Sequence, residues 1–344
     1  MPENKKVTLK SMAAILGVTP ATVSKALRDS NDISEEMRNR VKRLAAEVGY
    51  RPNIMARSLT GGKSRMFGVI VPDLRISFFS EVARGMYERA DELDYVPILL
   101  VNDEKPEIER RNVEFFCALG VDGILLNPAP GTENYPVYRQ LADEGRPVVC
   151  YDRYLDAFEF SSVTIDDSQA AYNLVSQLIK DGRKRILYLG PTEGLTVAVD
   201  RFNGYRRALK EGGIPFNRGQ VVHTNLYIDD AYRTMTRVLR KEERPDAVLC
   251  VGGLSAYGAG RAMLDSGVAI PEEIALGEFG DNDIISRLGV PFFTINQNPY
   301  QIGVTAVDLL VRTIESGPDP ITPQHVHIET KLIHRTVGTS AAAE

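Results

Sequence analysis

The chain has 344 residues, of which 43% are hydrophobic and 25% charged, without a low-complexity tract, and its formal net charge is −5. This length predicts two or three domains of an ordinary globular protein. The three cysteines are too scattered for a disulfide framework, and we expect free thiols. The N-terminus has no apolar leader, and no apolar run reaches the roughly 18–20 residues of a membrane span, which predicts a cytoplasmic protein without a membrane partner.

Charge is distributed unevenly along the chain. Residues 1–63 hold 12 Lys and Arg against 6 Asp and Glu, a net charge of +6, whereas the remainder holds 29 against 40, a net charge of −11. A basic segment joined to an acidic body is typical of a nucleic-acid-binding module attached to something else. Chance clustering is the alternative explanation on charge alone.

Three short helices are predicted in this basic segment, over 9–16, 20–27 and 35–48. Small residues at Ala13 and in the turn at Gly17, followed by a core-facing valine, give the first two helices the spacing of a helix-turn-helix unit. The outward side of the second helix is slim and carries no acid, so it suits a major groove about 12 Å wide. A plain three-helix bundle is the alternative.

A fourth, very short helix is predicted directly after the third. Asn53 can cap it, Ile54 to Leu59 form barely two turns, and Gly61 and Gly62 end it. A helix of this length is not stable alone in water. We therefore expect it to fold against a partner.

These segments together resemble a known family. The runs VTLKSMAAILGVTPATVSKAL (7–27), GYRPNIMARSL (49–59) and GVIVPD (68–73) are similar to the lac repressor / galactose repressor family of bacterial transcription regulators, and the resemblance covers essentially the whole chain. It implies a helix-turn-helix DNA-binding head at 1–49, and a hinge helix and linker at 50–63. The remainder, 64–344, would be an effector-binding and dimerisation body.

The resemblance also implies how the head contacts DNA. Leu59 matches a leucine that wedges into the minor groove, with Ala56 at the contact between the two hinge helices of a dimer. A linker leucine docked on the body is the alternative for Leu59. Pro20 and Ala21 stand where bases are read but cannot hydrogen-bond a base edge. We therefore expect specificity to depend more on Lys25, on Leu9 near the start of the first helix, and on the deformability of the DNA under Leu59. The predicted DNA-contacting residues are Thr8, Leu9, Thr19, Pro20, Ala21, Thr22, Ser24, Lys25, Asn53, Ala56, Arg57 and Leu59.

The body alternates strands with amphipathic helices, and its Val, Ile and Leu runs indicate a parallel α/β sheet buried on both faces. Its length suits two doubly wound lobes, and the resemblance implies the periplasmic-binding-protein type I fold. The N-terminal lobe is expected at about 64–162 and 292–324, and the C-terminal lobe at about 163–291 and 325–340. The candidate strands are 66–72, 96–102, 121–127, 146–152, 161–166, 183–190, 246–252, 274–280 and 292–297.

Ligands of such folds bind at the carboxyl ends of the strands. An acid and an arginine beside an aromatic wall suit a polyol there, and the resemblance assigns effector contacts to Ser77, Asp152, Arg201 and, near it, Asp281. Structural roles are the alternatives: Asp152 can cap a helix, and Gln297 can tie two strands. The candidate effector-binding residues are Ser77, Phe78, Asp152, Arg153, Arg201, Asp281 and Gln297.

Two departures from the family pattern bear on the effector. Gly252 and Gly253 stand where the family often has Ala-Asn-Asp, and Glu278 to Asp281 stand where it often has Gly-Phe-Asp-Asp. We therefore expect two polar side chains that bind free sugars in the family to be missing here. The segments EFGDND and YLGPTEGLTVAVDRF resemble the fructose-type repressors, whose effectors are sugar phosphates. Glycines expose backbone N–H groups to an anion. The expected effector is therefore a sugar, a sugar acid or a sugar phosphate.

The predicted function is a repressor of carbohydrate-metabolism genes that binds double-stranded, pseudo-palindromic operator DNA and responds to an effector between its lobes. The tail VGTSAAAE lacks a leucine heptad, so we expect a homodimer. No catalytic residue, metal or cofactor is expected, because the four histidines pair with no plausible nucleophile; metal binding by His325 and His327 is the weaker alternative. We expect a cytoplasmic, nucleoid-associated protein. A solute-binding protein of a sugar transporter is the alternative function.

Overall fold

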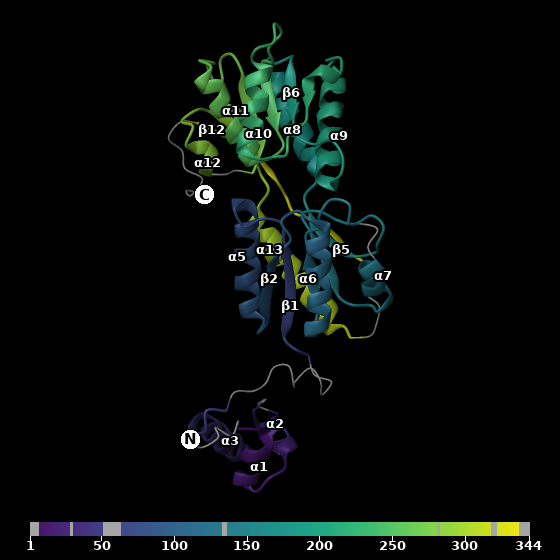
Figure 1. Ribbon diagram of the computed structural model, residues 1–344, viewed down its shortest axis with the longest axis vertical. Helices are drawn as coiled ribbons and strands as arrows, with labels where there is room; N and C mark the ends of the chain where they lie inside the picture. The colour runs from purple at the N-terminus through teal and green to yellow at the C-terminus, as the bar shows by residue number, and fades with distance from the viewer. Residues whose placement is uncertain are drawn as a thin grey trace. The chain divides into compact units, whose positions relative to one another are not determined.

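The computed structural model describes residues 7–27, 30–50, 63–132, 136–280, 283–317 and 322–336 (Figure 1). The chain divides into two units, Met1–Gly62 and Lys63–Glu344. Residues 51–62, which hold the whole predicted hinge helix, lie outside the described residues. The roles assigned to Asn53, Ala56, Arg57 and Leu59 therefore stay predictions. Within the described part, no helix has the length and apolar character that crossing a membrane requires.

The first unit contains the three predicted helices, α1 (Leu9–Leu16), α2 (Pro20–Leu27) and α3 (Glu35–Glu47). Gly17 ends α1 in the left-handed conformation at φ 69°, which glycine adopts without steric cost, and so turns the chain into α2. Ala13 and Val23 are buried together in the head's core, as the helix-turn-helix spacing predicted. Ser34 caps α3 by accepting a hydrogen bond from the Met37 N–H at 3.3 Å.

The second unit begins with a six-stranded sheet whose strands are all parallel. Its order is β2-β1-β3-β4-β5-β11, so the chain reverses direction across the sheet between β1 and β3. Such a reversal opens a crevice beyond the carboxyl ends of the strands. The strands are β1 (Met66–Val71), β2 (Val96–Val101), β3 (Ile124–Leu126), β4 (Val148–Tyr151), β5 (Ser161–Thr164) and β11 (His325–His327).

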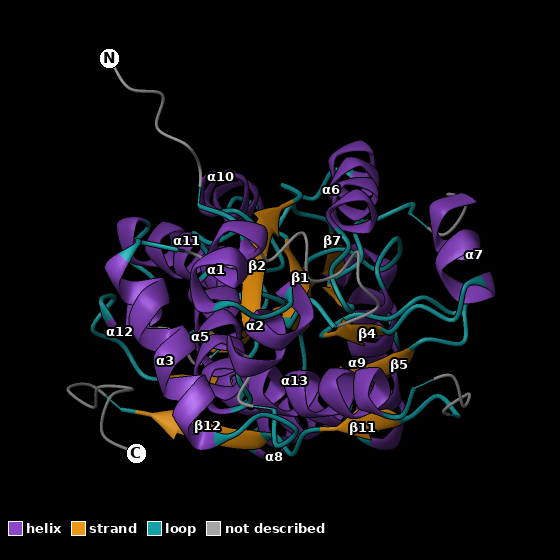
Figure 2. Ribbon diagram, turned by 90° about the horizontal axis from the view of Figure 1, so that it is seen from below, coloured by secondary structure: helices purple, strands orange, loops and turns teal. Residues whose placement is uncertain are grey.

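Helices cover both faces of this first sheet. Phe67, Val69 and Val71 of β1 share one buried cluster with α5 (Ser77–Glu92) and α13 (Pro299–Glu315). Met66 and Ile70, which point to the opposite face, pack with α6 (Pro106–Leu119) and α7 (Pro136–Asp143). Figures 1 and 2 show α13 and α6 on opposite sides of the sheet.

The other lobe repeats this plan. Its sheet has the order β7-β6-β8-β9-β10-β12, in which only β12 is antiparallel to its neighbour. The strands are β6 (Ile186–Leu189), β7 (Val221–Val222), β8 (Ala247–Cys250), β9 (Ala275–Phe279), β10 (Phe292–Asn296) and β12 (Lys331–Arg335). The helices are α8 (Asp167–Lys180), α9 (Thr196–Glu211), α10 (Ile228–Val238), α11 (Gly253–Asp265) and the short α12 (Asp283–Ser286), with a 3-10 turn at Arg218–Gln220. The second switch point lies between β6 and β8.

The chain crosses between the lobes later than predicted. Strand β10, expected in the N-terminal lobe, pairs with β9 and β12 of the second sheet, and β11, expected in the C-terminal lobe, pairs with β5 of the first. The crossings therefore follow β5, β10 and β11 rather than falling near 162, 291 and 325. Hydropathy identified β10 as a strand but not the sheet in which it pairs, and it did not identify β11, which is why the prediction placed these two segments in the wrong lobes.

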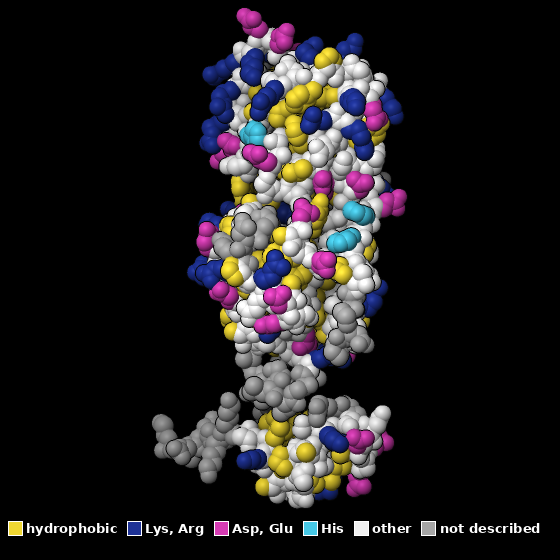
Figure 3. Space-filling view, turned by 90° about the vertical axis from the view of Figure 1, so that its right-hand side faces the viewer, with side chains coloured by type: hydrophobic (Ala, Val, Ile, Leu, Met, Phe, Trp, Pro, Cys, Tyr) yellow, Lys and Arg dark blue, Asp and Glu magenta, His cyan; other side chains and the backbone are white. Residues whose placement is uncertain are grey.

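Cys150 and Cys250 are buried free thiols, as predicted. The body's excess of acids does not form one acidic face on the side that Figure 3 shows, where acidic and basic side chains are interspersed and Lys and Arg gather on the upper lobe.

Candidate effector site and DNA-binding helix

Helix α2 presents the slim face that the sequence predicted. Thr19, Pro20, Ala21 and Lys25 are exposed, whereas the side of the helix that carries Val23 is buried. The Thr19 hydroxyl accepts a hydrogen bond from the Thr22 N–H at 3.1 Å and so caps the helix. Lys25 is the one charged residue within α2, so the exposed face carries a single positive charge.

The start of α1 holds two further predicted DNA contacts. Thr8 caps this helix by accepting a hydrogen bond from the Ser11 N–H at 3.2 Å, and its side chain is at the surface. Leu9 is partly buried and packs against the head's core. A structural role for Leu9 is therefore visible, and its predicted DNA contact is not tested.

Lys25 has an acidic neighbour that the helix itself did not reveal. Its Nζ lies 3.0 Å from Oδ2 of Asp32, which stands in the turn between α2 and α3, and both side chains are largely exposed. Ion pairs this exposed contribute only about 0–1 kcal/mol. DNA can therefore displace Asp32 at little cost in free energy.

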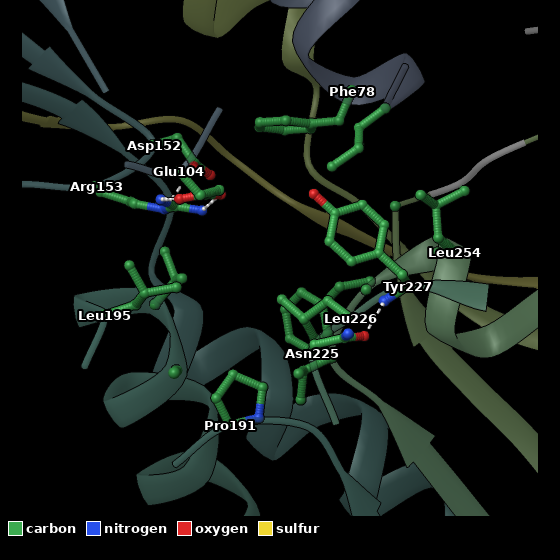
Figure 4. Close-up of a pocket in the computed structure, with 18 of the residues that line it drawn as sticks. Phe78, Glu104, Asp152, Arg153, Pro191, Leu195, Asn225, Leu226, Tyr227 and Leu254 are labelled. Carbon is green, nitrogen blue, oxygen red and sulfur yellow. Dashed lines mark hydrogen bonds and ion pairs between the residues drawn. The ribbon is translucent and has the colours of Figure 1, made fainter. Parts of the chain in front are cut away.

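A cavity of about 730 Å³ lies between the two sheets of the body. It is lined by loops that follow β1, β2, β3 and β4 in one lobe and β6, β7, β8, β9 and β10 in the other (Figure 4). These are the carboxyl ends of the strands, next to both switch points, where ligands of doubly wound sheets bind. The volume is in the range of about 300–1,000 Å³ that holds small organic ligands.

Arg201 projects from α9 to the cavity and is held by three protein groups. Its Nε donates to Asp167 Oδ1 at 2.6 Å, Nη1 to the Val251 carbonyl at 2.7 Å and Nη2 to Gln297 Oε1 at 3.0 Å. The guanidinium carbon also lies 4.0 Å from the centre of the Phe279 ring. These contacts fix the guanidinium plane before any ligand arrives, which is the preorganisation that a binding site needs.

Asp167 is the buried partner of this arginine. It stands at the start of α8, and burial raises its pKa to about 7, because desolvation outweighs the attraction of Arg201 and the charge of Asp152 adds to it. The Asp167 carboxyl is therefore about half protonated near pH 7 and becomes ionised as the pH rises above that value.

This pKa predicts a pH dependence of stability. An unfolded aspartate loses its proton near pH 4, whereas the native carboxyl holds it to about pH 7. The native state thus binds more protons between these values, so the free energy of unfolding falls as pH rises through that window. We expect the wild-type Tm to fall relative to that of Asp167→Asn between pH 5 and pH 8 in thermal unfolding. Parallel curves would exclude Asp167 as the titrating group.

Asp152 lies at the end of β4 in the other lobe. Its backbone is left-handed, with φ 62°, and the residue is only 9% exposed. Oδ2 accepts a hydrogen bond from Asn127 Nδ2 at 3.0 Å and lies 3.7 Å from Arg153 Nε. Burial raises the pKa of this carboxyl above its usual value. It lines the cavity rather than capping a helix.

The other two arginines of the cavity each have a carboxylate partner. Arg153 donates to both oxygens of Glu104, at 2.7 and 2.8 Å, and to the Pro128 carbonyl at 3.2 Å. Arg75 donates to both oxygens of Asp73, at 2.9 and 2.7 Å. Such bidentate pairs fix guanidinium geometry and neutralise its charge.

Most of the predicted effector residues converge on this cavity. Phe78, Asp152, Arg153, Arg201 and Gln297 all line it. Ser77 does not line it, although residues 76 and 78 do, and Asp281 lies outside the described residues.

Sequence reasoning missed the loop that follows β7. Asn225, Leu226 and Tyr227 line the cavity, and the Tyr227 hydroxyl lies 3.4 Å from Asp73 Oδ2 in the opposite lobe. Strand β7 has only two residues, so no periodic signal marked the loop after it. The polar residues Thr224 and Asn225 were the one feature of the sequence that could have indicated a ligand-binding loop here.

A helix-turn-helix head joined to a two-lobed body with an interlobe cavity defines a DNA-binding regulator that responds to a small molecule. Two family models agree: residues 8–53 match "Bacterial regulatory proteins, lacI family", and residues 67–318 match "Periplasmic binding protein domain". The chain belongs to the lacI family of bacterial regulatory proteins.

Relatives cover nearly the whole chain. The HTH-type transcriptional repressor CytR of Escherichia coli K12 is 30% identical over 328 residues, 95% of this chain and 93% of that protein. Catabolite control protein A of Priestia megaterium is 30% identical over 308 residues, 89% of this chain and 92% of that protein. The lac repressor dimer bound to operator and the anti-inducer ONPF has the same fold, with a TM-score of 0.84 at 23% identity, covering 97% and 99% of the two chains.

Proposed function

We propose that this chain is a homodimeric repressor of carbohydrate-metabolism genes whose affinity for operator DNA is set by a small effector in the interlobe cavity. The observation that carries the proposal is the preorganised Arg201 in a cavity lined by both lobes. A named relative supports the effector class: the ribose operon repressor of Halalkalibacterium halodurans is 27% identical over 329 residues, 95% of this chain and 96% of that protein. As a DNA-binding regulator it acts in the cytoplasm, and we propose association with the nucleoid.

An effector bound between the lobes contacts both of them and can therefore change the angle between them directly. Tyr227 and Asp73 already face one another across the cavity at 3.4 Å, and the Tyr154 hydroxyl lies 3.5 Å from Asp200 Oδ2 of the other lobe. A ligand that contacts both lobes stabilises one closure angle over another. We propose that closure alters the dimer interface and the hinge spacing, with a coupling of about 1–3 kcal/mol between effector and DNA.

The edge of the first sheet supports the dimer. Strand β2 is the outer strand, and Val96 and Val101 at its ends are 55% and 39% exposed. Tyr87 on the neighbouring helix α5 is 63% exposed. Exposed apolar side chains along an unpaired edge strand are unusual in a monomer, so we place the subunit contact here.

Selection of bound duplexes from random DNA by the full-length protein tests this function. We expect enrichment of a sequence with two symmetry-related half-sites, because a two-fold dimer presents two α2 helices. Lack of any enriched sequence would contradict the proposal. A solute-binding protein, the alternative, would enrich none and has no use for the head that matches at 8–53. The absence of catalytic activity stays a prediction.

Lys25 gives the sharpest test of readout. Lys25→Ala is expected to relax preference at one base pair per half-site, at a cost of about 1–3 kcal/mol, because a lysine reads guanine O6 and N7. Asp32→Ala frees the same ammonium from its 3.0 Å partner and should modestly raise affinity without changing the preferred base. Binding curves on single-base operator variants measure both. A uniform loss across all variants would make Lys25 a phosphate contact instead.

A further inference from the structure

The interlobe cavity is surrounded by helix N-termini that need hydrogen-bond acceptors. Helices α5, α9 and α11 begin after Ile76, Leu195 and Gly252, which all line the cavity, and none of these residues caps its helix through a side chain among the described contacts. The first N–H groups of a helix have no partner within the helix and are often satisfied by ligands. A ligand here is therefore offered donors from both lobes.

A buried hydroxyl gives independent evidence for a polar ligand. Thr224 lines the cavity, is only 7% exposed, and its Oγ1 has no hydrogen-bond partner among the described residues. Buried polar atoms without partners are rare in proteins, because each costs free energy. A ligand or a water must satisfy this group.

The guanidinium groups of the cavity do not add up to an anion site. Arg75, Arg153 and Arg201 each have a carboxylate partner within hydrogen-bond distance, at 2.7, 2.7 and 2.6 Å. Each pair carries no net charge when both members are ionised. Above pH 7, where Asp167 is ionised as well, the attraction that three arginines would exert on a phosphate is therefore cancelled within the protein.

One buried carboxylate is left over. Asp152 has no cation of its own: the arginine 3.7 Å from its Oδ2 is Arg153, which already pairs with Glu104. Glu193, the other unneutralised acid of the lining, is exposed and therefore screened by water. Asp152 is thus the group that an anionic ligand would meet unscreened.

Hydroxyl groups are uncharged and satisfy both demands. They accept from helix N–H groups and donate to a carboxylate, whereas a phosphate only accepts and an ammonium only donates. Apolar side chains complete the lining, and Figure 4 shows Leu226 and Leu254 across the cavity from the group of Asp152, Glu104 and Arg153, with Phe78 at the edge between them. Such a wall suits the C–H faces of a sugar ring.

Resting on the proposed function, we infer that the cavity selects an uncharged polyol over its phosphate ester, and that Asp152 is the specificity-determining residue. Gly252 is consistent with this role. A Cβ there would have no atom closer than 3.8 Å, so the glycine leaves room for a ligand beside the helix N-terminus. Among the three effector classes that the sequence left open, the inference therefore selects the uncharged sugar.

Matched pairs of ligands test the inference. Thermal shift and calorimetry at pH 8 compare ribose, glucose and adenosine with ribose 5-phosphate, glucose 6-phosphate and AMP on the full-length protein. We expect at least one uncharged member to bind, and its ester to bind at least about 100-fold more weakly, since unscreened like charges repel strongly. Asp152→Asn should weaken the uncharged ligand about tenfold and reduce the discrimination to less than about tenfold. Asparagine tolerates the left-handed backbone at φ 62°.

Asp94→Asn is the matched control. Asp94 also has a left-handed backbone, at φ 56°, but it is exposed and precedes β2 at the opposite end of the sheet. The control should leave both affinities unchanged. An ester that binds wild type as well as its parent, discrimination that persists in Asp152→Asn, or no bound uncharged probe would each overturn the inference. Loss of sequence-specific DNA binding by the same preparation would instead overturn the proposed function.

Discussion

Arg201→Ala is expected to abolish effector binding and to destabilise the body. The guanidinium joins Asp167, the Val251 carbonyl and Gln297, so its removal separates groups that come from three different elements. It also leaves Asp167 buried without its cation, and breaking a buried pair in this way costs about 3–5 kcal/mol. Urea unfolding should show this loss. Calorimetry should show at least about a 100-fold loss of affinity for whichever of ribose, glucose or adenosine binds wild type best.

A double variant separates the binding role of Arg201 from its structural role. Arg201→Met with Asp167→Asn removes both charges and keeps apolar volume over Phe279, so most of the lost stability should return. Affinity for the ligand should not return, because methionine donates no hydrogen bond. Arg201→Ala that binds the ligand like wild type, or a double variant in which affinity returns with stability, would show that Arg201 acts only on the fold.

The pattern of hydrophobic residues along the chain predicted most of the fold. Each of the nine candidate strands is present, because Val and Ile runs between helical segments identify buried parallel strands. The head followed from local chemistry: Thr19 caps α2, Gly17 makes the turn and Ser34 begins α3. These features depend on neighbours in sequence, and therefore a single sequence reveals them.

Features that depend on distant partners were missed. The pairing of Arg153 with Glu104 joins loops 49 residues apart, and its charge cancellation cannot be seen from either segment. The acid beside Lys25 comes from the following turn for the same reason. Arg153 was expected among the effector-binding residues, and the structure shows its charge already neutralised by Glu104. The net charge of a binding site depends on all the loops that line it, and one motif that supplies an arginine does not reveal it.

Gly303→Ala is expected to be among the most destabilising single substitutions in the body. Helices α5 and α13 cross here in contact of their backbones: a Cβ on Gly303 would lie 2.1 Å from the Val82 carbonyl oxygen, and one on Gly85 would lie 2.2 Å from the Tyr300 carbonyl oxygen. Backbone atoms cannot rotate away as a side chain can. The helices must separate and loosen the packing of Val82 and Met86, which we expect to cost about 3 kcal/mol or more.

Gly252→Ala is the matched control for this effect. Its backbone is extended, and the nearest atoms to a new Cβ are Leu226 Cδ2 at 3.8 Å and Ser255 Oγ at 3.9 Å, which is ordinary contact. Urea unfolding should therefore place Gly252→Ala near wild type and Gly303→Ala far below it. Gly303→Ala should also weaken effector binding, because α5 begins at the cavity and Phe78 in its first turn lines the cavity. Equal stabilities for the two variants would mean that α5 and α13 do not meet through their glycines.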